Sequence, residues 1–503
     1  MSDYLHGAYG QIQAVGSRVS DDSQGAIVLI GTAPVQQLQL GSGESYPVNV
    51  PVRVNDIAEA RKKLGYSKDW AKYTLCEAMH VFLESKGVGP LILINVLDPN
   101  KADHKASAKV TASLTPVNGV ITIVSAGDVI VDSIVVKTSG ENPTTKVKGT
   151  DYVVAYSIEK EKITIAELSS GALGTSALSV EYYKVDPTAV DADDVIGTTD
   201  GLGSNTGLFA MKDVYTKTGL IPAFLAAPGW SSLPAVHAAM YANSIKINGH
   251  WDAYMFVDLP LVDTDSTQLT LATARTWKAS NGYTKENETV FFPMAKGTDG
   301  AIYHLSVLAA ANFLQLLMEQ DGIPYKTASN TECAIITNLY LGAGFADRVY
   351  NDQIINENLN KYGIASAAFV GGRWAIWGCH SADYNPTDAD RINVAETNRM
   401  MLFYISNDFQ HRRAGDVDKP MTANDMQTII AEEQTRLDAL LKIGALTYGE
   451  VHANASADSR SDIMQGDYSF VFNVTTTPLA KSLTAIVNWT DDGFVTYFES
   501  SAE

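Results

Sequence analysis

Cysteine is scarce in this sequence, and the few cysteines lie far apart. Cys76, Cys333 and Cys379 are the only three among 503 residues, and none belongs to a Cys-x-x-Cys pair. A disulfide framework or a zinc site requires several cysteines or histidines at short, regular spacings. We therefore expect neither a disulfide-stapled fold nor a metal site.

Long apolar runs are also missing. The longest, residues 305–318, is shorter than the roughly 20 residues that a membrane-spanning helix needs. It also contains Ser306, Asn312 and Gln315, which is typical of a buried helix in a globular protein. The first residues lack the basic, apolar and small-residue pattern of a secretion signal. We expect no stable insertion into a membrane.

Basic residues are outnumbered by acidic ones. The chain has 37 Lys and Arg against 57 Asp and Glu, a formal net charge of -20. Proteins that bind nucleic acid need a basic surface for the phosphates, so nucleic acid is excluded as the main partner. Any surface through which such a chain associates with itself must keep like charges apart.

Familiar catalytic motifs are absent as well. The sequence contains no Gly-x-Ser-x-Gly elbow, no His-Glu-x-x-His pair and no Walker loop. The glycine-rich residues 201–207 do not follow an apolar strand and lack the spacing of a dinucleotide loop. Cys379 and His380 are adjacent, but catalytic groups are assembled across a fold and neighbouring side chains rarely face each other. The sequence predicts no catalytic residue, no metal ligand and no cofactor.

What the sequence does contain is a long α/β pattern. Hydrophobic residues make up 46% of the chain, and its length suggests roughly three domains. Apolar strand-like runs alternate with helical periods in two blocks, at 26–97 and from residue 207 onward. This alternation predicts a mostly parallel sheet covered by helices.

Between the two blocks the composition changes. Residues 101–197 are rich in Val, Thr, Ser and Gly, with turns at short intervals, which predicts an all-β insertion. An acidic cluster follows, and it lacks the alternate spacing of a calcium loop. We interpret this cluster as a solvated linker; its residues are Asp186, Asp191, Asp193 and Asp194.

The C-terminal part combines helices with short strands. Thr422 and Asp425 have the spacing of a capping box at the start of a helix, and Gly444 is a typical helix stop. Alternating apolar residues then predict strands at 468–475, 483–489 and 494–498. A short apolar strand near a chain end has few partners of its own, so it either frays or pairs with another chain.

These patterns together predict an α/β (α+β multidomain) protein. It has a helix-covered mixed sheet core, an inserted all-β domain, and a C-terminal α+β domain that carries exchangeable terminal strands. The expected divisions are an N-terminal arm at 1–20, the core at 21–100 and 201–390, the insertion at 101–200, the C-terminal domain at 391–490 and a C-terminal arm at 491–503.

Short motifs in a fixed order resemble those of the contractile tail sheath proteins of bacteriophages. The motifs are Gly31-Thr32-Ala33-Pro34, Glu77-Ala78-Met79-His80-Val81-Phe82, Ala227-Pro228-Gly229, Val257-Asp258-Leu259-Pro260, Leu359-Asn360-Lys361-Tyr362-Gly363-Ile364, Trp377-Gly378, Leu441-Lys442-Ile443-Gly444-Ala445-Leu446, Asp462-Ile463-Met464-Gln465-Gly466 and Thr477-Pro478-Leu479-Ala480. The chain departs from the family at Ala8-Tyr9-Gly10-Gln11, where Pro-Gly-Val-Tyr is frequent, and at Cys379-His380, where Arg-Thr is usual.

The resemblance implies a structural subunit and not an enzyme. Sheath subunits polymerise as stacked hexameric rings around a tail tube, and their contraction drives the tube through the host cell envelope. The implied partners are further copies of the chain, the tail tube protein, and the baseplate and tail terminator proteins. The implied location is the virion tail, after assembly in the host cell cytoplasm.

The resemblance also implies that terminal arms add strands to the sheets of neighbouring subunits. The residues expected in this strand exchange are Gln11, Ile12, Gln13, Val15, Tyr468, Phe470, Phe472, Phe494, Val495, Thr496, Tyr497 and Phe498. The helix from Thr422 to Lys442 is the candidate for facing the tube. Its candidate contact residues are Asp425, Glu432 and Arg436.

Three other interpretations remain open. The nearest is the sheath of a non-phage contractile injection particle, such as a tailocin. An α/β hydrolase-like enzyme would have a deep pocket with a nucleophile and a base in contact. The third is a β-rich adhesin built around residues 101–197. In that case this segment, expressed alone, would bind a cell surface.

Overall fold

The computed structural model describes residues 25–387, 392–454, 460–491 and 494. The chain divides into two compact units, Met1–Met421 and Thr422–Glu503. The first unit holds the large sheet and its covering helices, and the second holds a long helix and a β-hairpin.

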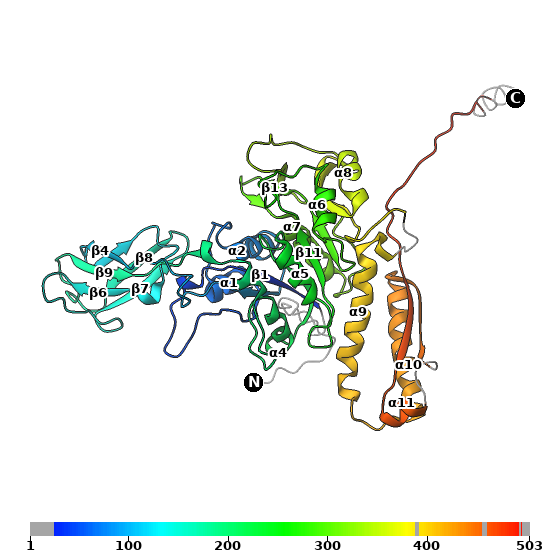
Figure 1. The fold of residues 1–503 in the computed structure, drawn as a ribbon, viewed down its shortest axis with the longest axis horizontal. Coiled ribbons are helices and arrows are strands. Elements are labelled where there is room, and N and C mark those ends of the chain that lie inside the picture. Colours follow the sequence, from blue (N-terminus) through cyan, green and yellow to red (C-terminus); the bar gives the residue numbers. More distant parts are fainter. Residues whose placement is uncertain (1–24, 388–391, 455–459, 492–493, 495–503) are drawn as a thin grey trace, which may run out of the picture. The chain divides into compact units, whose positions relative to one another are not determined.

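An eight-stranded sheet forms the centre of the first unit (Figure 1). Its strands, in spatial order, are β17 (Arg373–Trp377), β16 (Ile364–Val370), β12 (Glu288–Phe291), β11 (Tyr254–Asp258), β10 (Ile221–Ala226), β1 (Gly25–Gly31), β3 (Leu91–Asn95) and β2 (Val52–Val54). The inner strands are parallel, whereas β17 and β2 at the two edges run antiparallel to their neighbours. The mixed α/β fold that the sequence predicted is confirmed.

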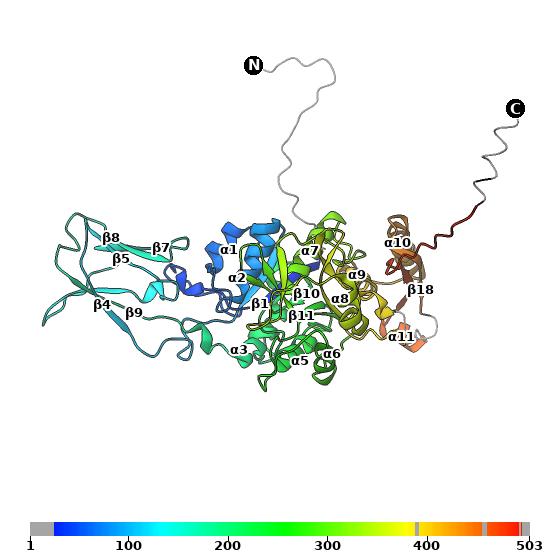
Figure 2. The ribbon, with the colours of Figure 1, turned by 90° about the horizontal axis from the view of Figure 1, so that it is seen from above.

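Helices cover both faces of this sheet, as a parallel sheet requires. Figure 2 shows α1 (Ile57–Leu64), α2 (Thr74–Ala78) and α7 (Leu305–Glu319) on one side, and α3 (Ala192–Ile196), α5 (Pro234–Ala242) and α6 (Ala274–Ser280) on the other. Helix α2 continues as a π-helix over Met79–Lys86. Eleven residues of α7 are buried, so this apolar run is the buried helix that its sequence predicts.

Three further helices and a small sheet also belong to the first unit. They are α4 (Val214–Thr218), α8 (Asp352–Asn358), α9 (Glu396–Arg413) and a small antiparallel sheet of β14 (Ile302–Tyr303), β13 (Met294–Gly297) and β15 (Ile336–Tyr340). Glu396, the first residue of α9, is buried. Its carboxyl group contacts Thr289 of β12 and Thr327, which joins this helix to the sheet.

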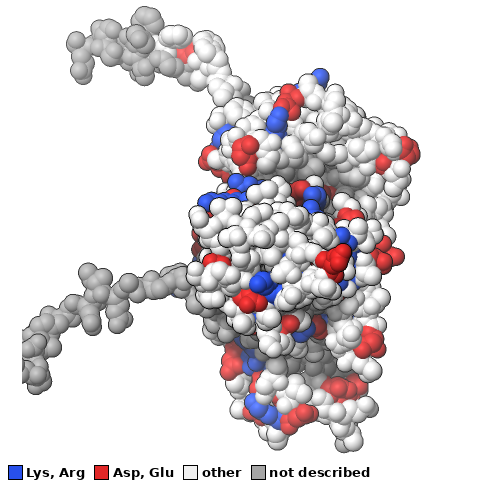
Figure 3. All heavy atoms as spheres, turned by 90° about the vertical axis from the view of Figure 1, so that its left-hand side faces the viewer, with Lys and Arg blue, Asp and Glu red and all other residues white. Residues whose placement is uncertain are grey.

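The segment between β3 and α3 forms two three-stranded antiparallel sheets. The first consists of β4 (Val110–Leu114), β9 (Leu178–Tyr182) and β6 (Val135–Thr138), and the second of β5 (Val120–Ile123), β8 (Lys162–Glu167) and β7 (Tyr152–Ser157). Their apolar residues form a cluster separate from that of the large sheet. Seen from the side that carries these sheets, acidic and basic side chains are scattered among wide uncharged areas (Figure 3).

The acidic cluster after these sheets is structural and not merely a solvated linker. Asp191 and Asp194 form a capping box at the start of α3. The carboxylate of Asp194 also lies 2.5 Å from Lys101 Nζ and 3.0 Å from His104 Nε2. The cluster therefore joins α3 to the chain that follows β3.

The second unit contains α10 (Ala423–Lys442), β18 (Leu446–Ala453), α11 (Arg460–Gln465) and β19 (Phe470–Thr476). Strand β18 was not predicted, because Gly449 and the polar residues around it hide its alternation. The strand predicted at 468–475 begins at Phe470, so Tyr468 lies before it. Residues 483–489, which the sequence predicts as a strand, form no ladder with any described residue of the chain.

Candidate subunit-contact site

Helix α10 begins and ends where its sequence predicts. The Thr422 hydroxyl accepts a hydrogen bond from the Asp425 N–H at 3.2 Å, and the Asp425 carboxylate accepts one from the Thr422 N–H at 2.8 Å. Hydrogen bonds from the hydroxyl and backbone of Thr422 lower the pKa of the Asp425 carboxyl. At the far end Gly444 has a φ of 78°, a left-handed conformation that favours glycine and lets the chain reverse into β18.

One face of α10 packs against the hairpin. Its buried residues are Ile429, Glu433, Leu437 and Leu440, at the spacing of one helix face. Gly449 of β18 allows the close approach, since a Cβ at this position would lie 3.2 Å from Leu437 Cβ. Glu432 and Arg436 lie on the exposed side of the helix.

The hairpin is a two-stranded antiparallel sheet, and a side chain of α10 is hydrogen-bonded to the outer edge of β18. Val451 pairs with Phe472 and Gly449 with Val474. The side-chain amide of Gln434, from α10, donates to the Gly449 carbonyl at 3.1 Å and accepts from the Val451 N–H at 3.1 Å. These are the backbone groups that β18 would offer to a further strand, so Gln434 takes the place of such a strand at this point.

After β19 the chain runs on in an irregular conformation with its apolar side chains uncovered. Thr477 still binds the turn after α10, through its N–H to the Ala445 carbonyl at 3.2 Å. Beyond it the segment extends away from the hairpin (Figure 1). Four large apolar side chains are nearly fully exposed: Leu483 at 90%, Ile486 at 84%, Val487 at 91% and Trp489 at 81%. Folded proteins bury most such side chains, and a cluster left exposed marks a contact surface.

The residues predicted for strand exchange lie in three places. Phe470 and Phe472 are half-buried on β19, and Phe494 is 58% exposed. The others, apart from Tyr468, lie outside the described residues: Gln11, Ile12, Gln13, Val15, Val495, Thr496, Tyr497 and Phe498. The exposed apolar residues at 483–489 were not predicted as a contact surface. Their alternation in the sequence predicted a strand but did not indicate its partner.

The crevice where an α/β enzyme would hold a ligand is filled by the chain's own side chains. In such sheets this crevice lies at the carboxyl ends of the strands where the strand order reverses, here at β1 and β10. The Thr32 N–H donates to Thr74 Oγ1 at 3.2 Å and the Thr74 N–H donates to Thr32 Oγ1 at 3.0 Å. A Cβ at Gly229, just after β10, would lie 2.9 Å from Thr74 Cγ2.

An ion pair between partly buried His304 and buried Glu77 lies at the same crevice. His304 Nδ1 lies 2.6 Å from a Glu77 carboxylate oxygen. Burial alone would lower the pKa of His304, but the Glu77 carboxylate raises it to about 9. The Ser306 N–H and hydroxyl both donate to Asp258 at the end of β11. These contacts join α7, α2 and β11. The carboxylates of Glu77 and Asp258 are therefore occupied by hydrogen bonds within the fold.

The adjacent Cys379 and His380 were considered as a catalytic pair, and the contacts of His380 are with other groups. His380 Nδ1 contacts the Val394 carbonyl, and its ring stacks on Tyr384 with 3.7 Å between the ring centroids. Within the described residues no group of three or more His, Cys, Asp or Glu side chains could hold a metal ion. No helix among the described residues is both long enough and apolar enough to cross a membrane.

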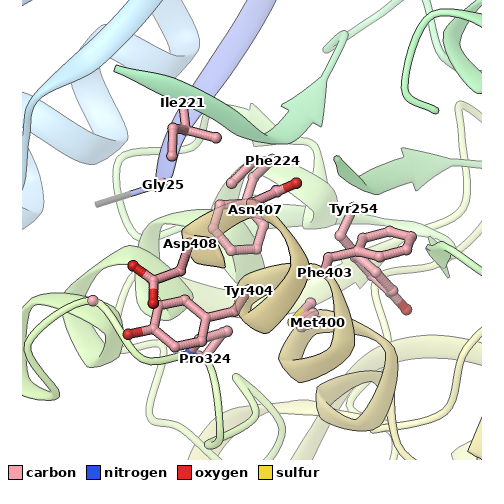
Figure 4. A pocket seen from close by; sticks show the side chains of 12 residues that line it. Gly25, Ile221, Phe224, Tyr254, Pro324, Met400, Phe403, Tyr404, Asn407 and Asp408 are labelled. Atoms are coloured by element: carbon pink, nitrogen blue, oxygen red, sulfur yellow. The ribbon is translucent and has the colours of Figure 1, made fainter. Parts of the chain in front are cut away.

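An apolar pocket at the amino ends of β1 and β10 is a packing site (Figure 4). Met400, Phe403 and Tyr404 of α9 line it against Phe224, and its cavity measures about 20 Å³, room for about one water. It is therefore too small for an organic ligand.

Polar contacts hold α9 in place beside this pocket. The Asn407 amide binds the backbone N–H and carbonyl of Asp252 at 3.1 and 2.8 Å. The Glu396 carboxyl accepts from the hydroxyls of Thr289 and Thr327 at 2.5 and 2.6 Å, and burial raises the pKa of Glu396. These hydrogen bonds anchor α9 at Glu396 and at Asn407 to the rest of the first unit.

Comparisons with known proteins identify relatives by sequence and by fold. No family model matches the chain. The tail sheath protein of Burkholderia phage BcepMu is 28% identical over 270 residues, which cover 52% of this chain and 50% of that protein. The chain therefore matches about half the length of this curated relative.

Solved sheath structures share the fold over nearly the whole chain. The anti-feeding prophage helical sheath in its contracted state has a TM-score of 0.51 at 13% identity and covers 98% of this chain and 100% of its own. The contracted sheath complex of the PVC extracellular contractile injection system has a TM-score of 0.51 at 12% identity, covering 98% and 99%. A sheath tail protein of Desulfitobacterium hafniense has a TM-score of 0.50 at 12% identity, covering 93% and 100%. The resemblance to contractile tail sheath proteins is confirmed.

Proposed function

We propose that this chain is the structural subunit of a contractile tail sheath. It polymerises around a tail tube, and contraction drives the tube through the host cell envelope without any bond chemistry. The relationship to the phage sheath protein supports this function, and the filled crevice at β1 and β10 favours a structural role over an enzymatic one.

The single observation that carries the proposal is the exposed apolar segment after β19. A sheet of only two strands is marginally stable by itself, and here it is followed by a segment with four nearly fully exposed apolar side chains. In our proposal residues 483–489 of one copy add a strand to the hairpin sheet of the next copy. Strand addition uses main-chain hydrogen bonds, so it holds two copies together while their rigid parts pivot.

The contact of Gln434 with β18 decides to which edge of the hairpin we assign the added strand. Gln434 already binds Gly449 and Val451 on β18, so we place the incoming strand on β19, which carries Phe470 and Phe472. One surface then meets a different surface on the next copy, and such heterologous contacts propagate into an open helix or into closed rings that stack. We also propose residues 11–15 and 494–498 as additional exchanged strands, which strengthen the contact made by residues 483–489 but are not required for it.

The wider scheme follows from the sheath function. The partners are further copies of the chain in stacked hexameric rings, the tail tube protein, and the baseplate and tail terminator proteins. The subunit assembles in the host cytoplasm and ends in the virion tail. On α10, the tube-facing candidates are Asp425, Glu432 and Arg436. Because Asp425 also caps the helix, Glu432 and Arg436 are the better contact candidates.

A second function within the same class is the sheath of a non-phage contractile injection particle. It is favoured by the likeness in fold to the sheath of an extracellular contractile injection system. Both functions use the same subunit contacts, so the test below applies equally to each.

Electron microscopy of concentrated protein with a matched pair of truncations tests the proposal. The full chain and a chain ending at Asp492 should both form hollow striated cylinders, whereas a chain ending at Thr477 should not. Cylinders in all three samples would remove the strand-donation scheme. Loss of cylinders already at Asp492 would move the donated strand to 494–498. Isolated particles in every sample, with and without added tail tube protein, would contradict the sheath function.

A further inference from the structure

A cleft rich in positive charge lies beside β2, the edge strand of the large sheet. Its volume is about 1010 Å³, and it is bounded by the loop before β2, by α1 and by the end of β7. One carboxylate, Glu44, lines it together with five cationic side chains: Arg53, Arg61, Lys62, Lys63 and Lys217. This local excess is opposite to the net charge of -20 of the whole chain.

Three of the five cations have partners within the chain. The pairs, with their N–O distances, are Lys63–Glu59 at 2.8 Å, Arg61–Glu84 at 3.2 Å and Lys217–Asp213 at 3.0 Å. They are partly exposed, and such pairs add little stability. Their charges are nevertheless balanced locally.

Arg53 and Lys62 are not balanced in this way. Among the residues that the structure describes, neither has a carboxylate within ion-pair distance. Arg53 is half-buried and Lys62 is exposed. The cleft therefore carries two positive charges that no described carboxylate of the chain balances, and a carboxylate from outside can balance them.

We propose that this cleft binds an acidic segment of a second copy of this chain. Guanidinium and ammonium groups that line one cleft are the donors that carboxylates bind best. A second copy is the favoured source because identical chains of net charge -20 repel each other unless a cation-rich surface of one meets carboxylates of the next. The proposal rests on the sheath function for the second copy, but it uses residues of the first unit, whereas strand addition uses the second.

Binding of a fluorescent hexaglutamate peptide to the full chain tests the chemistry of the cleft. The double substitution Arg53→Glu with Lys62→Glu should weaken binding at least tenfold. The matched control, Lys326→Glu with Lys361→Glu, makes the same change in net charge at exposed lysines elsewhere and should leave binding unchanged. Equal binding by both variants overturns the proposal. Tighter binding of a short DNA strand than of hexaglutamate also overturns it, since the cleft would then be a phosphate site.

Zero-length carbodiimide cross-linking of an assembled mixture of unlabelled and nitrogen-15-labelled copies tests the source of the segment. We expect hybrid-isotope peptides that join Lys62 or Lys63 to an Asp or Glu of the other copy. Cylinders whose hybrid cross-links arise only from lysines outside the cleft overturn this proposal and leave the sheath function intact. A sample that never associates overturns the sheath function and, with it, the contact between copies.

Discussion

Replacing Val487 by lysine tests strand donation at a single side chain. Side chains alternate between the two faces of an extended strand, so Leu483, Val487 and Trp489 would share one face and Asn488 would lie on the other. Val487 is 91% exposed within its own chain. Burying a valine side chain against a neighbour stabilises the contact by about 1.5–3 kcal/mol. The substitution Val487→Lys removes this burial free energy. It also places a charge where the sheet of the neighbouring copy would cover it.

The expected effect is large enough to measure as a change in critical concentration. A loss of about 1.5–3 kcal/mol raises the dissociation constant of the contact about 10- to 150-fold. The assay is sedimentation of cylinders from a dilution series, and Asn488→Lys is the control because it adds the same charge one residue away. We expect the critical concentration of Asn488→Lys to be near that of the unmodified chain, and that of Val487→Lys to be about 10- to 150-fold higher. Equal critical concentrations for the two variants would refute the assignment of this face as the buried one.

Three further predictions concern the two units separately. Gln434→Ala removes two hydrogen bonds to β18 and should lower the free energy of unfolding by about 1–3 kcal/mol; an unchanged denaturation midpoint would contradict the role of Gln434 at that edge. Because Glu77 raises the pKa of His304 to about 9 from an ordinary 6.5, their ion pair stabilises the fold fully below pH 6.5 and is lost as the pH rises through 9. The melting temperature should fall over that range, and His304→Gln should flatten the profile; a profile unaltered by this substitution would rule the pair out as its cause. Glu432→Lys reverses an exposed charge on α10 while keeping the cap that Asp425 forms, so it should reduce co-sedimentation with tail tube protein; full recovery would mean that α10 does not face the tube.

Local signals in the sequence predicted elements well where they agreed with the packing. The capping box at Thr422 and Asp425 and the stop at Gly444 set the ends of α10 as expected. The apolar run at 305–318 forms the buried helix α7, because a helix apolar on nearly all sides can only lie between other elements. Helix ends and buried helices depend on hydrogen bonds and apolar spacing within a few turns, and both can be recognised in the sequence.

Elements whose identity depends on distant contacts were missed or misplaced. Strand β18 has little alternation of its own; it exists because α10 covers one face of it and β19 pairs with its backbone. Residues 483–489 have the alternation of a strand and yet pair with no described residue of their chain. The same pattern fits a strand paired within the chain and a strand offered to another, and no local signal separates the two.

The sequence by itself determined the fold class of the protein. Its apolar periods predicted a helix-covered mixed sheet, and its motifs showed the resemblance to sheath subunits on which the proposed function rests. Tertiary structure decided which of these segments meet. It placed Gln434 on the edge of β18, left Val487 and its neighbours uncovered, and gathered Arg53 and Lys62 into one cleft. The physical reason is that periodicity and capping act over a few residues, whereas exposure, edge pairing and charge balance depend on groups brought together from across the chain.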